Sequence, residues 1–495
     1  MKLPGARGSV RQSFGYLGLG LFLAVATSVW VPTLIGQGRG GGGGARTDAP
    51  TRDWTQDMQM KIMQPFTLAA VGDVMIVRPA SQNDNPAFQS AIKIIKDADV
   101  GYGNFESLIR DELHFTGPLS GSMNGPKEVA PDLQAMGFKV MNRAGNHIFD
   151  SNQEGMFETL RILDEFGLVY AGAGRDLEDA RAPHFYEGPK GRIGLVGMFA
   201  PAEGEVSTTA IAAATYRLGN TGGRPGLNML HTTKMIVVSP DQLAALKKIQ
   251  DGIYERRGDF SNPVQLPTNE PADQIALFGQ IYKAGDKPGD RNYTMNPADL
   301  REILRSVKNG KEYSDFMIAS IHAHGAATEE QQWLFEDQTP DFLITLAHDA
   351  IDNGADAFAG SGPHVLRGIE IYKGKPIFYD LGEFFREWDW GCDCDADPSS
   401  PRTSAESNYK SGFSAQPVNY ESAITLSKYD KGKLQQVLIY PTWGQYDAPI
   451  SQRGIPEMAP PEIAQRILLR LQKLSEPFGT KIEIQGNVGV IRVAQ

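Results

Sequence analysis

Short apolar, β-branched runs alternate along the chain with segments whose apolar residues recur at helical spacing. Residues 66–71 have the composition of a buried strand, whereas Phe88, Ile92 and Ile95 follow the spacing of an amphipathic helix. The patterns predict strands at 66–71, 99–103, 139–142, 192–198, 315–321, 356–359, 420–427, 434–441 and 482–493. They predict helices at 88–98, 156–166, 241–253, 297–307, 341–353 and 461–474. Strands that alternate with helices in this way favour an α/β fold.

The segments between these elements indicate how the chain is divided. We expect a main α/β body over residues 65–390, interrupted by an insertion at 201–313 of the kind that carries specificity or a lid. Residues 391–417 are rich in Ser, Pro and Asp, and we expect a mobile polar loop there. Residues 418–495 are expected to add further strands and a helix.

The first residues have the pattern of a targeting segment. Residues 12–38 carry no charge and 16–36 are largely apolar, with basic residues on the N-terminal side. Residues 1–36 therefore act as a signal peptide, with a possible cleavage site at Ala24-Val25-Ala26, or as an uncleaved membrane anchor. Residues 37–64 include a run of glycines and are expected to be a flexible linker. We expect an exported protein, anchored facing outward if uncleaved, or periplasmic or secreted if cleaved.

Net charge argues against nucleic acid as a partner. The chain has 48 Lys and Arg against 59 Asp and Glu, and five of the basic residues lie in residues 1–46, which contain no acid. The rest of the chain has 43 basic and 59 acidic residues, a formal charge of −16. Such a body is unsuited to hold a polyanion through its general field. Cys392 and Cys394 are too few for a disulfide framework, and a zinc site there would need two more ligands.

Residues that bind metals or polarise phosphate occur at the ends of the predicted strands. They are Asp73, Asn104 or Glu106, Asn146 or His147, His322 or His324, and His364. Ligands of open α/β sheets bind at the carboxyl ends of strands, so these points are expected to meet at one edge. Oxygen and imidazole ligands suit one or two Mn, Zn, Fe or Mg ions. Two ions about 3.5–4 Å apart would generate a hydroxide for hydrolysis.

Each of these residues also has an ordinary structural explanation. Asp73 could cap a turn, His322 could pack at a buried strand end, and His364 could shape the turn after Gly362-Pro363. It is their ordered combination that favours a metal site.

The combination resembles the CapA family of poly-γ-glutamate capsule synthesis proteins, a branch of the metallophosphoesterase (calcineurin-like) superfamily. The most specific segment is His364–Phe384, and the resemblance extends over roughly residues 65–386. Other segments that carry it are Gly72-Asp73-Val74-Met75, Gly103-Asn104-Phe105-Glu106, Gly145-Asn146-His147 with Asp150, Ser320-Ile321-His322 and Gly360-Ser361-Gly362-Pro363-His364.

The resemblance implies a four-layer α/β/β/α sandwich, with residues 418–495 completing it, and a metal centre on its rim. By matching motifs, the metal ligands would be Asp73, Glu106, Asn146, His322 and His364, with Glu106 or Asn104 near a bridging position. His147 would be the general acid, and Asp150 would orient it. Arg224 and Asn228 of the insertion would bind substrate or simply shape a turn.

The chain departs from the family pattern at several positions. Ser361 stands where the family often has His, and Ala326 replaces an acid in the block that begins at His322. His324 and Glu383 are possible substitute ligands. These changes would retune the substrate, leave a single-metal site, or abolish activity.

The resemblance therefore implies a metal-dependent hydrolase of the phosphoesterase type, or one that cleaves γ-glutamyl amides. The expected partners are an anionic polymer such as poly-γ-glutamate and membrane-bound components of its synthase. One alternative is a non-catalytic, membrane-tethered scaffold of an envelope polymer assembly complex. Another is a secreted phosphoesterase unrelated to polymers.

Overall fold

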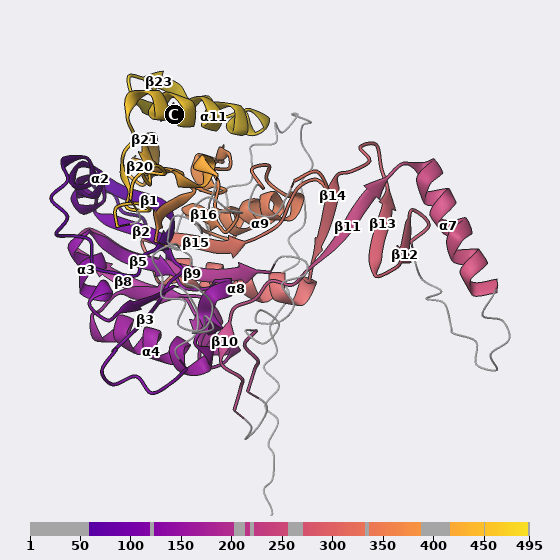
Figure 1. Cartoon of the computed structure of the whole chain (residues 1–495), viewed down its shortest axis with the longest axis horizontal. Coiled ribbons are helices and arrows are strands. Elements are labelled where there is room, and N and C mark those ends of the chain that lie inside the picture. The colour runs from indigo at the N-terminus through magenta and orange to yellow at the C-terminus, as the bar shows by residue number, and fades with distance from the viewer. Residues whose placement is uncertain are drawn as a thin grey trace, which may run out of the picture. The chain divides into compact units, whose positions relative to one another are not determined.

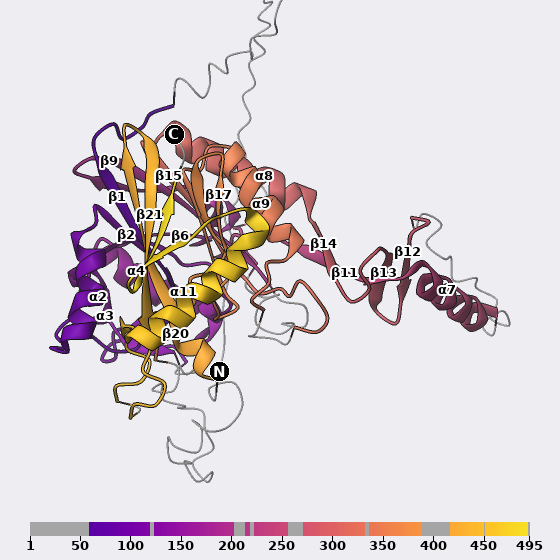
Figure 2. The same cartoon turned by 90° about the horizontal axis from the view of Figure 1, so that it is seen from above.

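The computed structural model describes residues 59–118, 123–201, 213–217, 222–255, 271–331, 336–387, 416–449 and 451–493 (Figures 1 and 2). These residues all belong to the second of two compact units, Thr55–Gln495. The predicted targeting segment 1–36, residues 37–58 of the predicted linker and residues 391–415 of the predicted loop lie outside them. Within the described ranges, every helix is too short or too polar to span a bilayer.

A ten-stranded mixed sheet carries the predicted site residues Asp73, Asn104 and Glu383. Its order is β23-β24-β21-β20-β1-β2-β5-β6, with β19 paired to β1 and β22 paired to β21. Its strands are β1 (Phe66–Met75), β2 (Val100–Phe105), β5 (Phe138–Asn142), β6 (Val169–Ala171), β19 (Glu383–Arg386), β20 (Glu421–Asp430), β21 (Lys433–Trp443), β22 (Glu457–Met458), β23 (Glu483–Gln485) and β24 (Val488–Arg492). Strands β19, β1, β2, β5 and β6 pair in parallel, and β20 pairs antiparallel with β1.

A six-stranded sheet carries the predicted site residue His322. Its order is β17-β18-β16-β15-β9-β8, and β9, β15, β16 and β18 are parallel. The strands are β8 (His184–Gly188), β9 (Gly191–Ala200), β15 (Phe316–Ala323), β16 (Ala357–Ser361), β17 (Ile369–Tyr372) and β18 (Lys375–Phe378).

The two sheets pack face to face between two layers of helices. Successive side chains of a strand point to opposite faces, so Leu68 and Ala70 of β1 enter the core between the sheets, whereas Ala69 and Val71 enter the core under the helices. Helices α2 (Pro86–Asp97), α3 (Val129–Ala135) and α4 (Asn152–Glu165) cover the ten-stranded sheet, and α8 (Pro297–Glu312) and α9 (Asp341–Asp352) cover the other (Figure 2). The predicted four-layer α/β/β/α sandwich is confirmed.

Shorter elements connect these layers. They are β3 (Leu108–Arg110), β4 (Asn124–Pro126), η1 (Asn146–Phe149), β7 (Ala173–Gly174), α5 (Leu177–Arg181), β10 (Gly226–Leu227), η4 (Pro417–Tyr420) and η5 (Glu476–Phe478).

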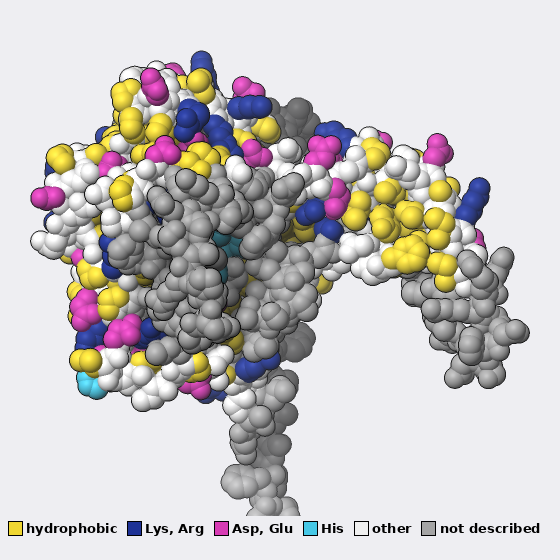
Figure 3. Space-filling view, viewed as in Figure 1, with side chains coloured by type: hydrophobic (Ala, Val, Ile, Leu, Met, Phe, Trp, Pro, Cys, Tyr) yellow, Lys and Arg dark blue, Asp and Glu magenta, His cyan; other side chains and the backbone are white. Residues whose placement is uncertain are grey.

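The predicted insertion contains a four-stranded sheet that the sequence pattern did not indicate. Its order is β12-β13-β11-β14, and α7 contacts β12 and β13. The elements are β11 (Thr232–Val238), α7 (Pro240–Glu255), β12 (Gln274–Leu277), β13 (Gln280–Ala284) and β14 (Arg291–Met295). Tyr293 of β14 joins this sheet to the sandwich, because its ring lies 5.1 Å from that of Phe342 in α9. Hydrophobic side chains gather over the sheet and α7 (Figure 3), and Ile249 and Phe278 are exposed.

The C-terminal residues extend the ten-stranded sheet. The single strand predicted at 482–493 is wrong: β23 and β24 form a hairpin, because the chain turns at Gly486, whose φ of 61° favours glycine. Helix α11 (Pro461–Ser475) packs Ile467, Leu468 and Leu471 against the core between the sheets. Since α11 contacts both β21 and β17, it spans from one sheet to the other.

Candidate metal centre

Strand register brings polar residues from both sheets to one edge. Asp73 of β1 lies opposite Glu383 of β19 on one side and Asn104 of β2 on the other. In the facing sheet, His322 of β15 lies beside Ser361 of β16. Because these strands are parallel, the residues near their carboxyl ends meet at the same edge. We use the term cluster for Asp73, Glu106, His147, His322, His324, His364 and Glu383.

A close approach of two glycines brings Asp73 and Glu383 together. A Cβ atom on Gly72 would lie 1.9 Å from the carbonyl oxygen of Gly382, so a larger residue would push the two strands apart. The backbone N–H of Asp73 donates to that carbonyl at 3.0 Å. The short distance that glycine permits therefore places two acidic side chains next to each other.

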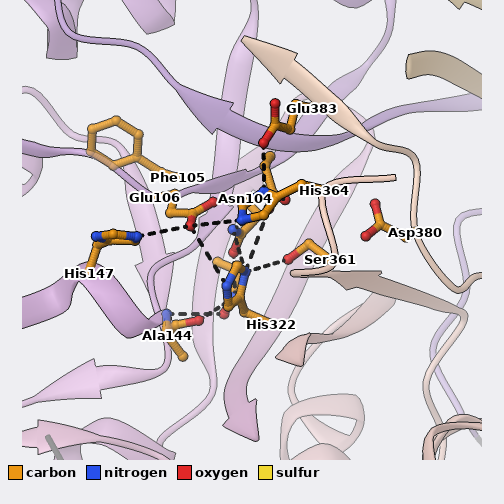
Figure 4. Close-up of polar contacts among 12 residues, drawn as sticks. Asn104, Phe105, Glu106, Ala144, His147, His322, Ser361, His364, Asp380 and Glu383 are labelled. Carbon is orange, nitrogen blue, oxygen red and sulfur yellow. Dashed lines mark hydrogen bonds and ion pairs between the residues drawn. The ribbon is translucent and has the colours of Figure 1, made fainter. Parts of the chain in front are cut away.

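Glu106 occupies the centre of the cluster. It directly follows β2 and is fully buried, and neither carboxylate oxygen has a hydrogen-bond partner among the described residues. The Nε2 atoms of His147, His322 and His364 lie 3.8, 3.8 and 4.0 Å from Glu106 Oε1 (Figure 4). A buried carboxylate without donors is costly unless a cation compensates it. The surroundings of Glu106 are those of a metal ligand.

Asp73 faces the Nδ1 atoms of His322 and His364, whereas Glu106 faces their Nε2 atoms. Its Oδ2 is 3.3 Å from His364 Nδ1, and its Oδ1 is 3.6 Å from His322 Nδ1. Asn104 Nδ2 donates to Asp73 Oδ1 at 2.7 Å, which fixes the rotamer of the carboxylate. Asp73, Glu106 and His364 offer ligand atoms within 4.8 Å of one another. Such a group can hold a metal ion, and its oxygen and nitrogen donors fit a divalent one.

Polar neighbours hold the imidazoles of His322 and His364 in place. His322 Nδ1 lies 3.0 Å from Ser361 Oγ, and the ring stacks on Phe199 at 6.0 Å. His364 Nδ1 lies 2.8 Å from Glu383 Oε1. When Nδ1–H donates to such an acceptor, the Nε2 lone pair is directed to the metal, as in many protein metal sites.

The two predicted substitute ligands both lie at the cluster. The ring of His324 is 5.3 Å from that of His322 and 5.5 Å from that of His364, and it is 2% exposed. Glu383 contacts His364 through one oxygen and Arg386 through the other. Their role as ligands stays a prediction.

His147 differs from the other imidazoles in its access to solvent. Its side chain is 16% exposed, against 0% for His322. Its Nδ1 lies 2.7 Å from Asp150 Oδ2, as expected if Asp150 orients the ring, which leaves Nε2 towards Glu106. Asn146, the first residue of η1, follows Gly145, where a Cβ atom would lie 3.9 Å from the His322 ring. The assignment of Asn146 as a ligand stays a prediction.

Burial and mutual charge shift the pKa values of the cluster in opposite directions. Burial and the charge of Asp73 raise the pKa of Glu106. Burial would raise the pKa of Asp73 too, but hydrogen bonds and charges of His322 and His364 outweigh it and the pKa is lowered. Burial would lower the pKa of His364, yet Glu383 and Glu106 outweigh it and the pKa is raised. Burial and the neighbouring imidazoles lower the pKa of His324.

Arg224 and Asn228 lie on the insertion side and make contacts within the protein. The Arg224 guanidinium donates to the carbonyl of Ala213 at 2.7 and 3.0 Å. The buried Asn228 amide donates to Gly197 O at 2.8 Å and accepts from Arg181 at 2.9 Å. These contacts give both side chains a structural use, and substrate binding by them stays a prediction.

Sequence reasoning missed residues that lie directly behind the cluster. Asn142 Nδ2 donates to Asn104 Oδ1 at 2.7 Å and so orients the amide that holds Asp73. Arg143 is 1% exposed and donates to Phe105 O at 2.9 Å, and burial lowers its pKa to about 10. The sequence does contain a signal for these two residues, because Asn142 ends the predicted apolar strand at 139–142 and Arg143 follows it, just before Gly145-Asn146-His147.

Several known proteins are similar to this chain. The family model described as bacterial capsule synthesis protein PGA_cap matches residues 67–387. An uncharacterised protein of Sinorhizobium fredii, y4sH, is 38% identical over 464 residues, which cover 89% of this chain and 96% of that protein. The capsule biosynthesis protein CapA of Bacillus anthracis is 24% identical over 336 residues, 66% of this chain and 61% of that protein. A solved structure of a candidate 5′-nucleotidase from Staphylococcus aureus, in complex with alpha-ketoglutarate, is 10% identical with a TM-score of 0.33, covering 75% of this chain and 52% of that one.

Proposed function

Because the chain belongs to the bacterial capsule synthesis protein PGA_cap family, we propose that it is an exported protein that processes a γ-glutamyl polymer of the capsule through a metal-dependent hydrolase site. The similarity to a capsule biosynthesis protein over 66% of this chain supports the polymer as substrate. The uncharged segment 12–38 supports export.

The observation that carries the hydrolase site is the environment of Glu106. This carboxylate is fully buried and lacks a hydrogen-bond donor among the described residues, yet three imidazole nitrogens face one of its oxygens. Asp73 completes the group within ligand distance. A cluster that only stabilised the fold would be expected to satisfy these oxygens with hydrogen bonds.

Each residue of the cluster has a definable task. Glu106, Asp73, His322 and His364 hold the metal, which when bound supplies a Lewis acid and a hydroxide source. His147 gives a proton from Nε2 to the leaving group, because its ring is the one that reaches solvent. Asp150 keeps the ring oriented by accepting from Nδ1.

The charge of the molecule requires that the polymer be held locally. On the face drawn in Figure 3, the described Lys and Arg side chains are interspersed with Asp and Glu. A formal charge of −16 beyond residue 46, where 43 basic and 59 acidic residues lie, repels a polyanion at long range. The metal centre is therefore the point of attraction, and membrane-bound components of the synthase deliver the polymer to it.

Metal content and polymer cleavage test the proposal together. The full chain, purified in detergent without chelator, is expected to contain about one or two divalent ions and to shorten a γ-glutamyl polymer. The double variant Glu106→Gln/His322→Ala should lose most of the metal, a drop of more than about tenfold, and should not cleave. His114→Ala is the matched control, because His114 is exposed and lies outside the cluster.

Other results would contradict the proposal in different ways. A wild-type protein free of metal would exclude the metal site. A metal-loaded protein that leaves the polymer intact, in cells whose capsule survives the double variant, would instead favour the non-catalytic scaffold.

A further inference from the structure

A pocket lies at the opposite end of the strands from the metal centre. It has a volume of about 270 Å³ and is lined by Phe66 and Phe316, the first residues of β1 and β15, and by the turns between β17 and β18 and between β20 and β21. Asp73 lies seven positions after Phe66 along β1, about 23 Å of extended strand. The pocket is therefore distinct from the cluster.

The floor of the pocket is aromatic. The ring of Phe66 lies 5.1 Å from that of Phe316 and 5.8 Å from that of Tyr429, and the last two rings are 5.1 Å apart. Ile62 and Leu434 add aliphatic surface, and all five side chains are less than 10% exposed. A floor of this kind favours the apolar part of a ligand.

Two lysines at the rim lack a partner. Lys61 and Lys433 are exposed, and neither forms an ion pair or side-chain hydrogen bond with any residue in the described ranges. A Cβ atom on Gly432 would lie 3.1 Å from Lys61 Cβ, so the stem of Lys61 packs on the turn that leads to Lys433. Lys61 and Lys433 therefore lie on the same side of the rim.

The other charges at the pocket are engaged. Lys375 Nζ lies 3.3 Å from Asp356 Oδ1, and Lys373 Nζ lies 2.6 Å from Asp352 Oδ1. The Asp315 carboxylate accepts from the backbone N–H of Arg192 at 2.8 Å. Lys61 and Lys433 are thus the two positive charges at the pocket without an ion pair among the described residues, and together they outweigh the carboxylate of Asp315, so the pocket attracts an anion.

We propose that this pocket binds the headgroup and first methylenes of an anionic phospholipid. The two ammonium groups match a phosphate at the rim, and the aromatic floor matches the start of an acyl chain. Sequence position supports a lipid over a free anion. Lys61 lies close to the start of the described chain at Gln59, and the residues before it include the uncharged segment 12–38. Lipid in this pocket would place the amino ends of the strands against the bilayer and the metal centre away from it.

Binding of short-chain lipids to the full chain tests the pocket without metal or polymer, so a failure here is distinguishable from a failure of the proposed function. In non-ionic detergent, calorimetric titration with dihexanoylphosphatidylglycerol should show saturable binding to a single site. Dihexanoylphosphatidylcholine, which has the same tails and no net charge, should bind at least about tenfold more weakly, as should glycerol phosphate, which lacks the tails.

Two double variants locate the binding site. Lys61→Ala/Lys433→Ala should weaken phosphatidylglycerol binding about twenty-five-fold, from about fivefold per lysine. Lys96→Ala/Lys308→Ala removes the same charge from exposed lysines of α2 and α8 and should leave the affinity unchanged. All four lysines are exposed, so unchanged thermal unfolding should show that both variants fold.

Three outcomes would overturn the lipid assignment. Equal loss in both double variants would mean that only the overall charge matters. Equal affinity for glycerol phosphate would mean a simple anion site without an apolar component. Displacement of the lipid by a γ-glutamyl oligomer, with the same dependence on Lys61 and Lys433, would make the polymer the occupant.

Discussion

Single buried charges affect how the cluster is held together. Arg386 is 1% exposed and pairs with the buried Glu383, whose other oxygen contacts His364. Burying both ions costs desolvation energy, so the pair contributes little net stability while both partners are present. Removing one partner leaves the other charge buried and uncompensated, which is the costly situation.

We therefore expect Arg386→Met to lower the free energy of unfolding by about 3–5 kcal/mol. Adding Glu383→Gln to it should recover part of the loss, because the uncompensated charge is then gone. Arg161 pairs with Glu158 and Glu165 on the surface, and Arg161→Met should cost less than about 1 kcal/mol. Urea unfolding of all variants, with chelator present throughout, measures the differences. Similar losses for Arg386→Met and Arg161→Met would contradict the expectation.

At the scale of elements, the sequence pattern predicted the strands and helices of the sandwich better than their pairing. Buried strands such as β1 and β15 have apolar runs that stand out, so their positions were predicted to within a few residues. Pairing depends on contacts between distant segments. The adjacency of Asp73 and Glu383 rests on the close approach at Gly72, which only the folded backbone reveals.

The missed insertion sheet has a related cause. Every residue of β13, Gln280–Ala284, is only partly buried, so its sequence lacks the alternation of a half-buried strand. The cluster residues themselves were predictable because metal-binding residue types stand at or shortly after the ends of recognisable strands. Asn142 and Arg143 also stand at such a strand end, but they act through Asn104 and Phe105, and those contacts appear only in the folded chain.

One contact between elements should depend on pH. His231, which precedes β11, places Nδ1 2.6 Å from Asp299 Oδ2 in the first turn of α8. The hydrogen bond to Asp299 raises the pKa of His231 above its ordinary value of 6.5, against the effect of burial. Its contribution to stability is therefore complete below pH 6.5 and is lost as the pH rises through the raised value.

His231→Gln should consequently lower the thermal midpoint most under mildly acidic conditions. The difference from wild type should be largest at about pH 5.5 to 6.5 and should shrink as the pH is raised from there to about 8.5, because Asp299 stays ionised throughout while His231 loses its proton. Differential scanning calorimetry across this range measures the trend. A difference that is constant with pH would show that the contact is not charge-dependent.

At the scale of the whole molecule, the family match and the folding unit have different extents. The match ends at residue 387, but β20 pairs with β1 from Phe66↔Tyr429 to Ala70↔Thr425. The same C-terminal region supplies Val437, Ile439 and Ile467 to the core between the sheets. Strand β1, which carries Asp73, is therefore completed on one side by residues beyond the family match.

A chain that ends at Glu387 should consequently fail to fold. Burial of a side chain contributes roughly 1.5–3 kcal/mol to the free energy of unfolding, and truncation would remove the buried side chains of Val437, Ile439, Ile467, Leu468 and Leu471. Their sum is comparable to the whole stability of a typical folded protein, about 5–15 kcal/mol. Truncation also exposes the edge of β1, which favours aggregation. Co-expression of residues 1–387 with 416–495 should restore a soluble complex, because the missing strand and core residues are then supplied in trans. Cooperative unfolding of the truncated chain alone would show that the sandwich closes without β20 and α11.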